Sequence, residues 1–199
     1  LIRVGMNNPQ QRLKQYAFEL SGGQRQRAMI AMALCTNPDI LIADEPTTAL
    51  DVTTQAQTLD LLNELQEKNG MSIIMITHDL GVIAELADDV NVMYLGKVVE
   101  SGTIEQVYKS PIHPYTKSLL SSIPSLATKH RERLPILQGT IPHPVARPSG
   151  CNFQPNCEGQ KEECLDAIPI IIEESSGHFA LYCGVCYEDH KCAWYPRGI

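Results

Sequence analysis

Apolar and polar positions in the first half of the chain alternate between helical and strand-like patterns. Helices are predicted over residues 10–19, 21–34 and 52–67, and the last of these should bury Leu59, Leu62 and Leu65. Residues 40–43 and 72–76 are short apolar runs, a pattern typical of strands buried on both faces of a parallel sheet. Helices alternating with such strands predict an α/β fold.

The second half of the chain has a different pattern. It predicts short helices over residues 80–87 and 103–109, and between them a hairpin of residues 90–94 and 97–100. Another short helix should begin after His113 and pack Tyr115, Leu119 and Leu120 inward. Residues 127–149 hold four prolines, which exclude long regular elements, so this segment is interpreted as a linker.

Two glycines open the helix that is predicted to follow Ser21. Serine is a favoured N-cap residue, and Gly22 and Gly23 have no Cβ, so an anion can come close to the backbone. The unpaired N–H groups and the positive end of the helix dipole would face that anion. Most Ser-Gly-Gly strings only cap a helix, so the phosphate interpretation depends on the motifs that follow.

Ionisable residues come directly after both apolar strands. Asp44 and Glu45 end the first strand, and His78 lies just beyond the second. Open α/β sheets bind their ligands at this carboxyl end of the strands. Adjacent side chains on an extended segment point in different directions, so Asp44 and Glu45 can have separate functions.

These motifs, in this order and spacing, resemble the second half of an ATP-binding cassette, the motor unit of ABC transporters. The likeness is carried by Leu-Ser-Gly-Gly-Gln-Arg-Gln-Arg at residues 20–27, Asp-Glu-Pro-Thr-Thr-Ala-Leu-Asp at residues 44–51 and Thr-His-Asp at residues 77–79. It implies a P-loop NTPase-like ABC ATPase core. It also implies that the γ-phosphate of an ATP held on the opposite subunit is clasped by Ser21, Gly22, Gly23 and Gln24.

The resemblance implies further roles at the strand ends. Asp44 would help to hold Mg²⁺ through water, and Glu45 would act as general base toward the attacking water. His78 would contact the γ-phosphate and help to position Glu45. Asp51 would lie in the loop that crosses the dimer interface, and it also suits the N-cap of the next helix.

The cassette is incomplete in this sequence. The phosphate-binding loop G-x-x-x-x-G-K-[ST] is absent, because the one Gly-Lys pair, Gly96-Lys97, is followed by Val98 and preceded by Asn91 at the first glycine position. The chain begins with Leu1 rather than Met, and we expect it to be part of a longer ATPase. We therefore expect negligible ATP turnover from this chain by itself.

One segment narrows the resemblance to a subgroup. Ser-Pro-Ile-His-Pro-Tyr-Thr-Lys-Ser-Leu-Leu at residues 110–120 and Ser-Ile-Pro at residues 122–124 resemble the ATP-binding subunits of oligopeptide and dipeptide importers, with nickel importers nearby. This implies a division into residues 1–109, the partial cassette, and residues 110–199, a C-terminal extension. The implied partners are a second cassette subunit, identical or not, transmembrane permeases and an extracytoplasmic peptide-binding protein, with the chain at the cytoplasmic face of the membrane.

The seven cysteines are unevenly placed. Cys35 stands alone and is expected to be a small buried residue, whereas the other six follow residue 150. No export signal is visible, which favours a metal site over disulfides. Cys151, Cys157 and Cys164 resemble the importer extension, in which a fourth cysteine completes a [4Fe–4S] cluster; four thiolates also suit Zn²⁺. Cys183 is the preferred fourth ligand, and Cys186 and Cys192 remain open.

Charge and hydropathy limit the rival interpretations. The formal net charge of −7 disfavours a nucleic-acid partner, and no apolar run is long enough to span a bilayer. A non-transport cassette acting in DNA repair or translation would usually show two cassettes or large coiled-coil inserts, and neither is visible. A metal-bearing regulatory module is the third alternative, in which the Cys-rich extension is the main function.

Overall fold

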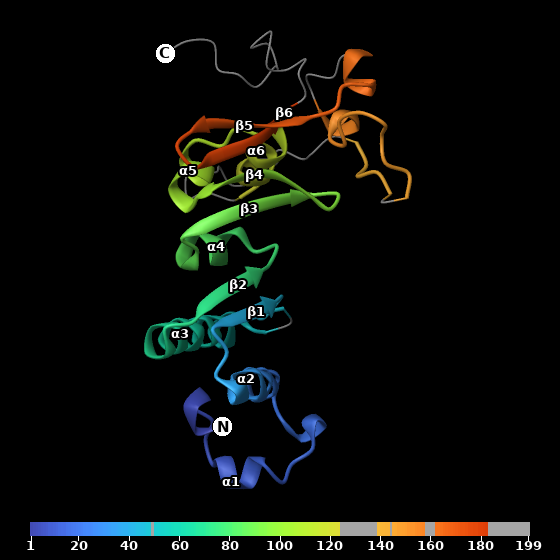
Figure 1. The fold of residues 1–199 in the computed structure, drawn as a ribbon. Helices are drawn as coiled ribbons and strands as arrows, with labels where there is room; N and C mark the ends of the chain where they lie inside the picture. The colour runs from blue at the N-terminus through green and yellow to red at the C-terminus, as the bar shows by residue number, and fades with distance from the viewer. Residues whose placement is uncertain (49, 124–138, 144, 158–161, 183–199) are drawn as a thin grey trace, which may run out of the picture. The chain divides into compact units, whose positions relative to one another are not determined.

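The computed structural model describes residues 1–48, 50–123, 139–143, 145–157 and 162–182. The chain forms two compact units, Leu1–Asp79 and Leu80–Ile199. Figure 1 shows the helices and strands of both units. No helix in the described ranges is long and apolar enough to cross a membrane.

The first unit is built around a parallel pair of strands. In chain order its elements are η1 (Ile2–Val4), α1 (Pro9–Arg12), η2 (Ala17–Glu19), α2 (Gly22–Ala33), η3 (Leu34–Thr36), β1 (Ile40–Asp44), α3 (Val52–Asn69) and β2 (Ser72–Ile76). Strands β1 and β2 pair from Ile40 opposite Ser72 to Asp44 opposite Ile76. Parallel strands need a crossover connection, which α3 supplies beside the pair (Figure 1). The predicted α/β alternation is confirmed.

The two long helices of this unit begin at side-chain caps. At α2 the Ser21 Oγ accepts the Gln24 N–H at 3.3 Å, and Gln24 Oε1 accepts the Ser21 N–H at 3.0 Å. Helix α3 begins at Asp51, whose carboxylate accepts the Thr54 N–H at 2.9 Å, and it ends at Gly70 with φ 64°. Both N-caps satisfy backbone donors that the helix itself leaves unpaired, as predicted from Ser21 and Asp51.

Helix α3 packs its leucines into the core. Leu59, Leu62 and Leu65 are all buried, which confirms the predicted inward face. Leu62 and Leu65 share a cluster with residues in or next to η1, α2, η3, β1 and β2, and its other members are Val4, Met6, Ile30, Leu34, Leu41, Leu61 and Met71. This cluster supports one face of the strand pair.

The opposite face of the strand pair is exposed, so the prediction of strands buried on both faces is wrong. Leu41 points into the core at 8% exposure, whereas Ile42 beside it is 65% exposed. Ile40, Ile74 and Ile76 are likewise exposed. Alternate residues of a strand point to opposite faces, and the described helices of this unit cover only one of them.

The predicted helix over residues 10–19 is also wrong. Helix α1 ends at Arg12, and Tyr16 adopts an extended backbone with φ −80° and ψ 157°. The Tyr16 N–H donates to Glu19 Oε2 at 2.7 Å, so this local cap for η2 replaces a helical bond. Leu13 and Tyr16, within the predicted helix, are exposed.

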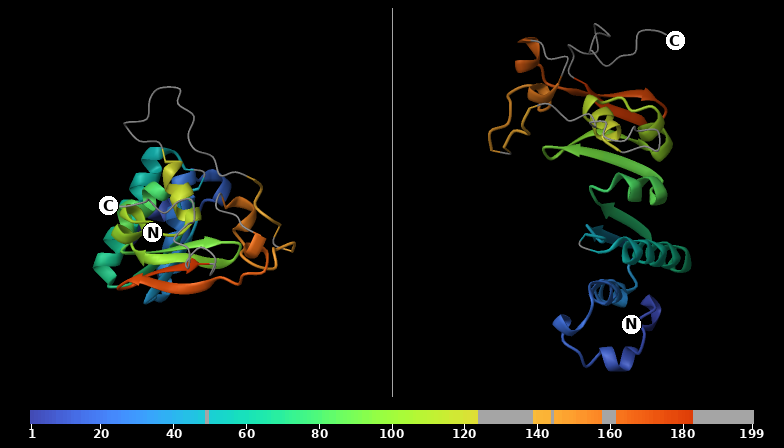
Figure 2. Two further views of the ribbon diagram at one scale, coloured as in Figure 1. Left: turned by 90° about the horizontal axis from the view of Figure 1, so that it is seen from above. Right: turned by 180° about the vertical axis from the view of Figure 1, so that it is seen from behind.

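The second unit contains a four-stranded antiparallel sheet. Its elements are α4 (Leu80–Leu86), β3 (Asp89–Tyr94), β4 (Lys97–Thr103), α5 (Ile104–Lys109), α6 (Pro114–Ser121), η4 (Gln154–Asn156), η5 (Glu162–Leu165), β5 (Ile170–Ser175) and β6 (His178–Tyr182). The strand order is β3-β4-β6-β5. The predicted β3–β4 hairpin is confirmed, and Figure 2 shows α6 to one side of the sheet.

A buried carboxylate holds three parts of this unit together. Glu100 on β4 is almost fully buried and accepts the backbone N–H groups of Ile112 at 2.8 Å and His113 at 2.9 Å. His178 Nε2, on β6, lies 2.9 Å from Glu100 Oε1. Buried charges require such partners. Residues on both sides of position 110 thus pack into one unit, and the sequence division at residues 109 and 110 stays a prediction.

An aromatic cluster adds the segment around η4 to this unit. The ring of Phe153 lies 5.3 Å from that of Tyr94 in an edge-on arrangement, and the Tyr115 ring lies 4.8 Å from Tyr94. The Tyr94 hydroxyl donates to Asn156 Oδ1 at 2.8 Å. The predicted inward packing of Tyr115 is therefore confirmed.

Candidate functional site

The backbone at Glu45 is fixed by the neighbouring strand. Glu45 directly follows β1 and has φ 47°, a left-handed conformation that is uncommon for residues other than glycine. Its N–H donates to the carbonyl of Ile76, the last residue of β2, at 2.8 Å. The Thr48 N–H then donates to the Glu45 carbonyl at 3.2 Å. This turn directs the Glu45 side chain out of the strand.

Two side chains hold the Glu45 carboxylate. His78 Nδ1 lies 2.7 Å from Oε1, and the Thr48 hydroxyl donates to Oε2 at 2.6 Å. The group remains open to solvent, because the His78 side chain is 81% exposed and that of Glu45 is 37% exposed. A polar ligand could therefore reach both the carboxylate and the imidazole.

The two partners shift each other's protonation. Hydrogen bonds from Thr48 and then His78 hold the pKa of Glu45 below its ordinary value. The hydrogen bond and the negative charge of Glu45 raise the pKa of His78 above its ordinary value. The charged pair therefore persists between the lowered carboxyl pKa and the raised imidazole pKa. It is lost when Glu45 binds a proton at low pH or when His78 releases one at high pH.

Asp44, the predicted Mg²⁺ ligand, is the last residue of β1 and is exposed. It lies opposite Ile76 in the parallel register, next to Glu45 in sequence. Its carboxylate suits a cation that takes most of its ligands from water and phosphate, because Mg²⁺ is commonly held by one or two protein carboxylates.

The glycines of α2 make a close contact with the start of α3. A Cβ built on Gly23 would lie 2.5 Å from Thr54 Cγ2, whereas one on Gly22 would lie 3.4 Å from Leu50 Cδ2. Thr54 cannot turn away freely, because its hydroxyl donates to Asp51 Oδ2 at 2.7 Å. Sequence reasoning attributed both glycines to anion approach alone. The structure adds helix packing as a second reason for Gly23.

The predicted site residues thus gather in two groups. Glu45 and His78 meet at the strand ends, together with Thr48. Ser21, Gly22, Gly23 and Gln24 form the first turn of α2, against the first turn of α3. Sequence reasoning missed the roles of Thr48 and Thr54. The available signal was a threonine three residues after each carboxylate, Thr48 after Glu45 and Thr54 after Asp51. At this spacing a turn can bring the hydroxyl next to the carboxylate.

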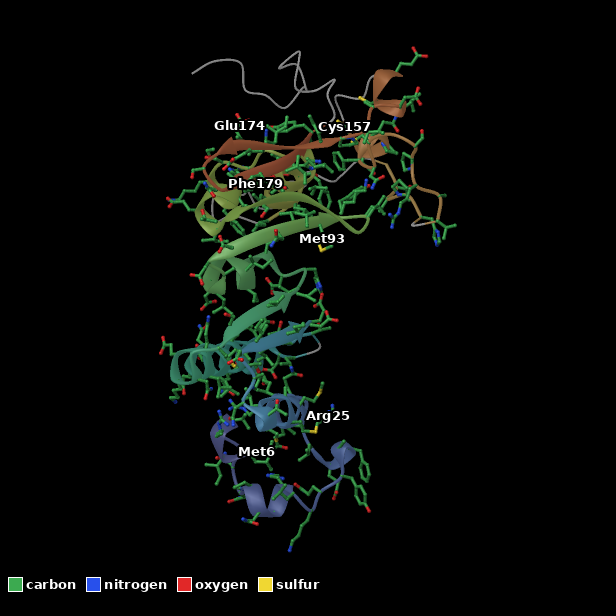
Figure 3. All side chains as sticks on the ribbon, viewed as in Figure 1. Met6, Arg25, Met93, Cys157, Glu174 and Phe179 are labelled. Atoms are coloured by element: carbon green, nitrogen blue, oxygen red, sulfur yellow. The ribbon has the colours of Figure 1, made fainter. Side chains whose placement is uncertain are left out.

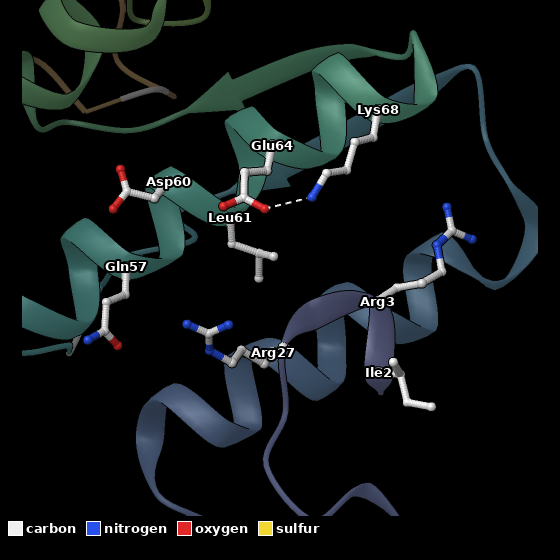
Figure 4. Close-up of a pocket in the computed structure, with 9 residues that line it drawn as sticks. Ile2, Arg3, Arg27, Gln57, Asp60, Leu61, Glu64 and Lys68 are labelled. Atoms are coloured by element: carbon white, nitrogen blue, oxygen red, sulfur yellow. Dashed lines mark hydrogen bonds and ion pairs between the residues drawn. The ribbon is translucent and has the colours of Figure 1, made fainter.

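A cavity of about 400 Å³ lies elsewhere in the first unit, between η1, α2 and α3 (Figure 4). Its cationic side chains already have partners within the chain. Arg3 donates to Asn37 and Asn69, Arg27 donates to the Val4 carbonyl, and Lys68 pairs with Glu64. None of the predicted site residues lines this cavity.

The predicted cysteine ligands are only partly within the described residues. Cys151 and Cys157 pack against the aromatic cluster, and Figure 3 labels Cys157. The Cys151 N–H donates to the Cys164 carbonyl at 3.3 Å. Cys183 lies outside the described residues. Among those described, no three His, Cys, Asp or Glu side chains form a group that could hold a metal ion.

Cys35 was expected to be buried, and that expectation is wrong. It lies on η3, after the end of α2, and is exposed. Its thiol donates to the Ala31 carbonyl at 3.2 Å, which gives the sulfur a polar contact at the surface.

Two family models match separate parts of the chain. The model of the ABC transporter family matches residues 1–48, and that of the oligopeptide/dipeptide transporter C-terminal region matches residues 99–164. The first match contains α2 with its glycines and the Glu45–Thr48 turn. The second contains β4 from residue 99 onward, the His113 segment and three of the cysteines.

Individual proteins show the same likeness. A "Putative peptide import ATP-binding protein" of Brucella ovis is 50% identical over 183 residues, which cover 89% of this chain and 54% of that protein. Another of that description, from Brucella abortus, is 49% identical over 171 residues, 86% of this chain and 51% of that protein. The chain therefore spans about half the length of the curated relatives it matches.

Among solved structures, a post-hydrolysis ATP-binding cassette dimer bound to ADP and Pi is 32% identical to this chain. The match has a TM-score of 0.45 and covers 52% of this chain and 43% of that chain.

Replacement of Gly23 by alanine should destabilise the first unit. The new methyl group would collide with Thr54 Cγ2, and overpacking of this kind costs about 1–3 kcal/mol of unfolding free energy. Urea unfolding measures this cost. Gly22→Ala is the matched control and should change stability much less. Adding Thr54→Ser, which removes Cγ2 and keeps the hydroxyl, should recover most of the loss; equal loss in Gly22→Ala and Gly23→Ala would contradict the packing argument.

Glu45→Gln should lower the pKa of His78 toward its ordinary value, because the substitution removes the negative charge that favours the imidazolium. NMR titration of the His78 ring measures this pKa. Glu105→Gln, which removes a carboxylate paired with Lys109 in the other unit, is the control and should leave His78 unchanged. The same His78 titration curve in wild type and Glu45→Gln would show that the pair does not form in solution.

Proposed function

The chain belongs to the ABC transporter family, and from that premise we propose that it is part of the ATP-binding subunit of an importer of oligopeptides or dipeptides. The observation that carries the proposal is the Glu45–His78 contact at the ends of two adjacent parallel strands. The peptide substrate is supported by the match of residues 99–164 and by the names of the curated relatives. We propose residues 1–109 as the cassette part and residues 110–199 as the importer-specific extension.

In the proposed mechanism, two cassettes bind ATP between them and each contributes to the other's nucleotide. Ser21, Gly22, Gly23 and Gln24 would face the γ-phosphate held by the second subunit. The first turn of α2 supports this role, because its N–H groups and dipole favour an anion. Asp51, at the start of α3, would lie near the same interface, and its carboxylate is kept ionised by Thr54, which lowers its pKa.

Hydrolysis would depend on the strand-end group. Glu45 would accept a hydrogen bond from the attacking water and so orient it, and its lowered pKa keeps it ionised at neutral pH. His78 would contact the γ-phosphate while holding the carboxylate in place. Mg²⁺ near Asp44 would neutralise charge on the phosphates. The protein's contribution is positioning and electrostatic stabilisation rather than covalent catalysis.

The proposal includes partners outside this chain. A second cassette subunit would complete the nucleotide sites, permease subunits would form the pathway across the membrane, and a peptide-binding protein would deliver substrate on the far side. The chain would then work at the cytoplasmic face of the membrane. Nickel import and a non-transport cassette function remain the alternative uses of the same site.

Co-purification tests this function. The tagged parent protein, cross-linked in its own cells, should retain permease subunits and a second cassette. Recovery of ribosomes or DNA in place of a permease would overturn the transport proposal. Recovery of a nickel-binding protein in place of a peptide-binding protein would show that the transported substrate is nickel rather than peptide.

The 199-residue chain by itself should release no phosphate from ATP above background, because its sequence has no phosphate-binding loop to hold the β- and γ-phosphates. A phosphate-release assay on wild type and Glu45→Gln should give the same rate for both. Robust hydrolysis that disappears in Glu45→Gln would show that the chain assembles a complete site.

We further propose, on the family resemblance, that Cys151, Cys157, Cys164 and Cys183 hold a [4Fe–4S] cluster, with Zn²⁺ as the alternative. The backbone bond between Cys151 and Cys164 supports it by bringing two of these residues together. The buried Asn152 Nδ2, next to Cys151, also lacks a hydrogen-bond acceptor in the structure. The cysteines within the described residues do not form a metal site by themselves, so no step of the mechanism depends on this group.

Anaerobic purification followed by iron, sulfide and zinc assays tests the metal proposal. We expect about four irons and four sulfides per chain, as a [4Fe–4S] cluster requires. Cys164→Ser should lose the iron, whereas Cys35→Ser, on the exposed η3 segment, should retain it. Zinc without iron would replace the cluster by Zn²⁺, and neither metal would overturn the proposal.

A further inference from the structure

We propose that Thr48 is a positioning residue for Glu45, whose hydroxyl holds one carboxylate oxygen while His78 holds the other. The two contacts together fix the direction in which the carboxylate faces the attacking water. This inference rests on the proposed function, in which Glu45 is the general base.

The contact is built into the turn that follows β1. The Glu45 N–H is held by the Ile76 carbonyl, so the parallel neighbour sets the position of the Glu45 backbone. The chain then turns, with the Thr48 N–H donating to the Glu45 carbonyl, and this turn brings the Thr48 hydroxyl to 2.6 Å from Oε2. A carboxylate with only one partner could rotate about that contact, whereas two donors on different oxygens fix its plane.

Thr48 makes this contact at the surface, where its side chain takes little part in core packing. Thr47 is buried, whereas Thr48 is exposed. An exposed hydroxyl can bond to water at similar free energy, so its bond to Glu45 adds little to fold stability. Its effect falls on the carboxylate, because the Thr48 hydroxyl holds Oε2 at 2.6 Å while His78 holds Oε1 at 2.7 Å.

The arrangement still allows a water to bind. Each carboxylate oxygen can accept more than one hydrogen bond, so Oε1 and Oε2 keep acceptor capacity after the contacts with His78 and Thr48. With one donor on each oxygen, the carboxylate keeps a fixed direction and still has room for a water. Thr48 therefore orients the base.

NMR titration of the 199-residue chain, with ¹³C-labelled glutamate, tests this inference without nucleotide. The Glu45 carboxyl signal is assigned by its loss in Glu45→Gln. We expect Thr48→Val, which keeps the shape and removes the hydroxyl, to raise the pKa of Glu45 toward its ordinary value. Thr48→Ser should preserve the wild-type value. Thr53→Val, an exposed threonine of α3, is the matched control and should change nothing.

The His78 titration serves as the internal reference. In Thr48→Val the pKa of His78 should stay raised, which shows that the pair and the fold persist. An unchanged Glu45 pKa in Thr48→Val, or a Thr48→Ser variant that behaves like Thr48→Val, would overturn the role of the hydroxyl. Either result leaves the co-purification test of the transport proposal unaffected, so the two can fail separately.

Discussion

The candidate site depends on the register of one parallel strand pair. Because Asp44 lies opposite Ile76, the first residue beyond β1 can donate its N–H to the last carbonyl of β2. His78, two residues past the end of β2, then lies within reach of the Glu45 carboxylate. A slip of one residue would turn every side chain of a strand to the opposite face and separate this pair. The hydrogen bonds between β1 and β2 therefore determine that Glu45 and His78 meet at the ends of these strands.

Helix α3 connects the two groups of candidate residues within the first unit. Its first turn lies against Gly23 of α2 through Thr54. One residue later, Gln55 donates to Asp79, the neighbour of His78, at 3.1 Å. The same short segment begins at Asp51, the N-cap residue of α3. A displacement of the start of α3 would therefore move both the first turn of α2 and the segment that contains His78. This gives a physical route between the two groups that are proposed to face phosphate.

Local patterns predicted much of this arrangement, whereas contacts between distant residues escaped them. Ser21 and Asp51 could be recognised as caps, and the leucines of α3 as an inward face, because their signals lie within one element. The exposure of Tyr16 and Ile42 could not be predicted, since it depends on which other elements cover them. The contact of Gly23 with Thr54 joins two helices, and the sequence pattern does not predict how these helices pack together. The contact of Thr48 with Glu45 lies between these two cases. It is short-range in sequence, but it forms only because the backbone at Glu45 is left-handed, which the sequence pattern does not indicate.

The geometry of the candidate site does not depend on burial of the exposed face of the strand pair. Burial of an isoleucine side chain is worth roughly 1.5–3 kcal/mol, and Ile40, Ile42, Ile74 and Ile76 leave much of that gain unrealised in this chain. The positions of Glu45, Thr48 and His78 do not depend on this burial free energy. Its geometry comes from the β1–β2 ladder, the Ile76 carbonyl and the Thr48 turn, none of which needs a covering layer on that face. A chain that spans about half the length of its relatives can therefore hold the strand-end group in place while the sheet beneath it is covered on one side.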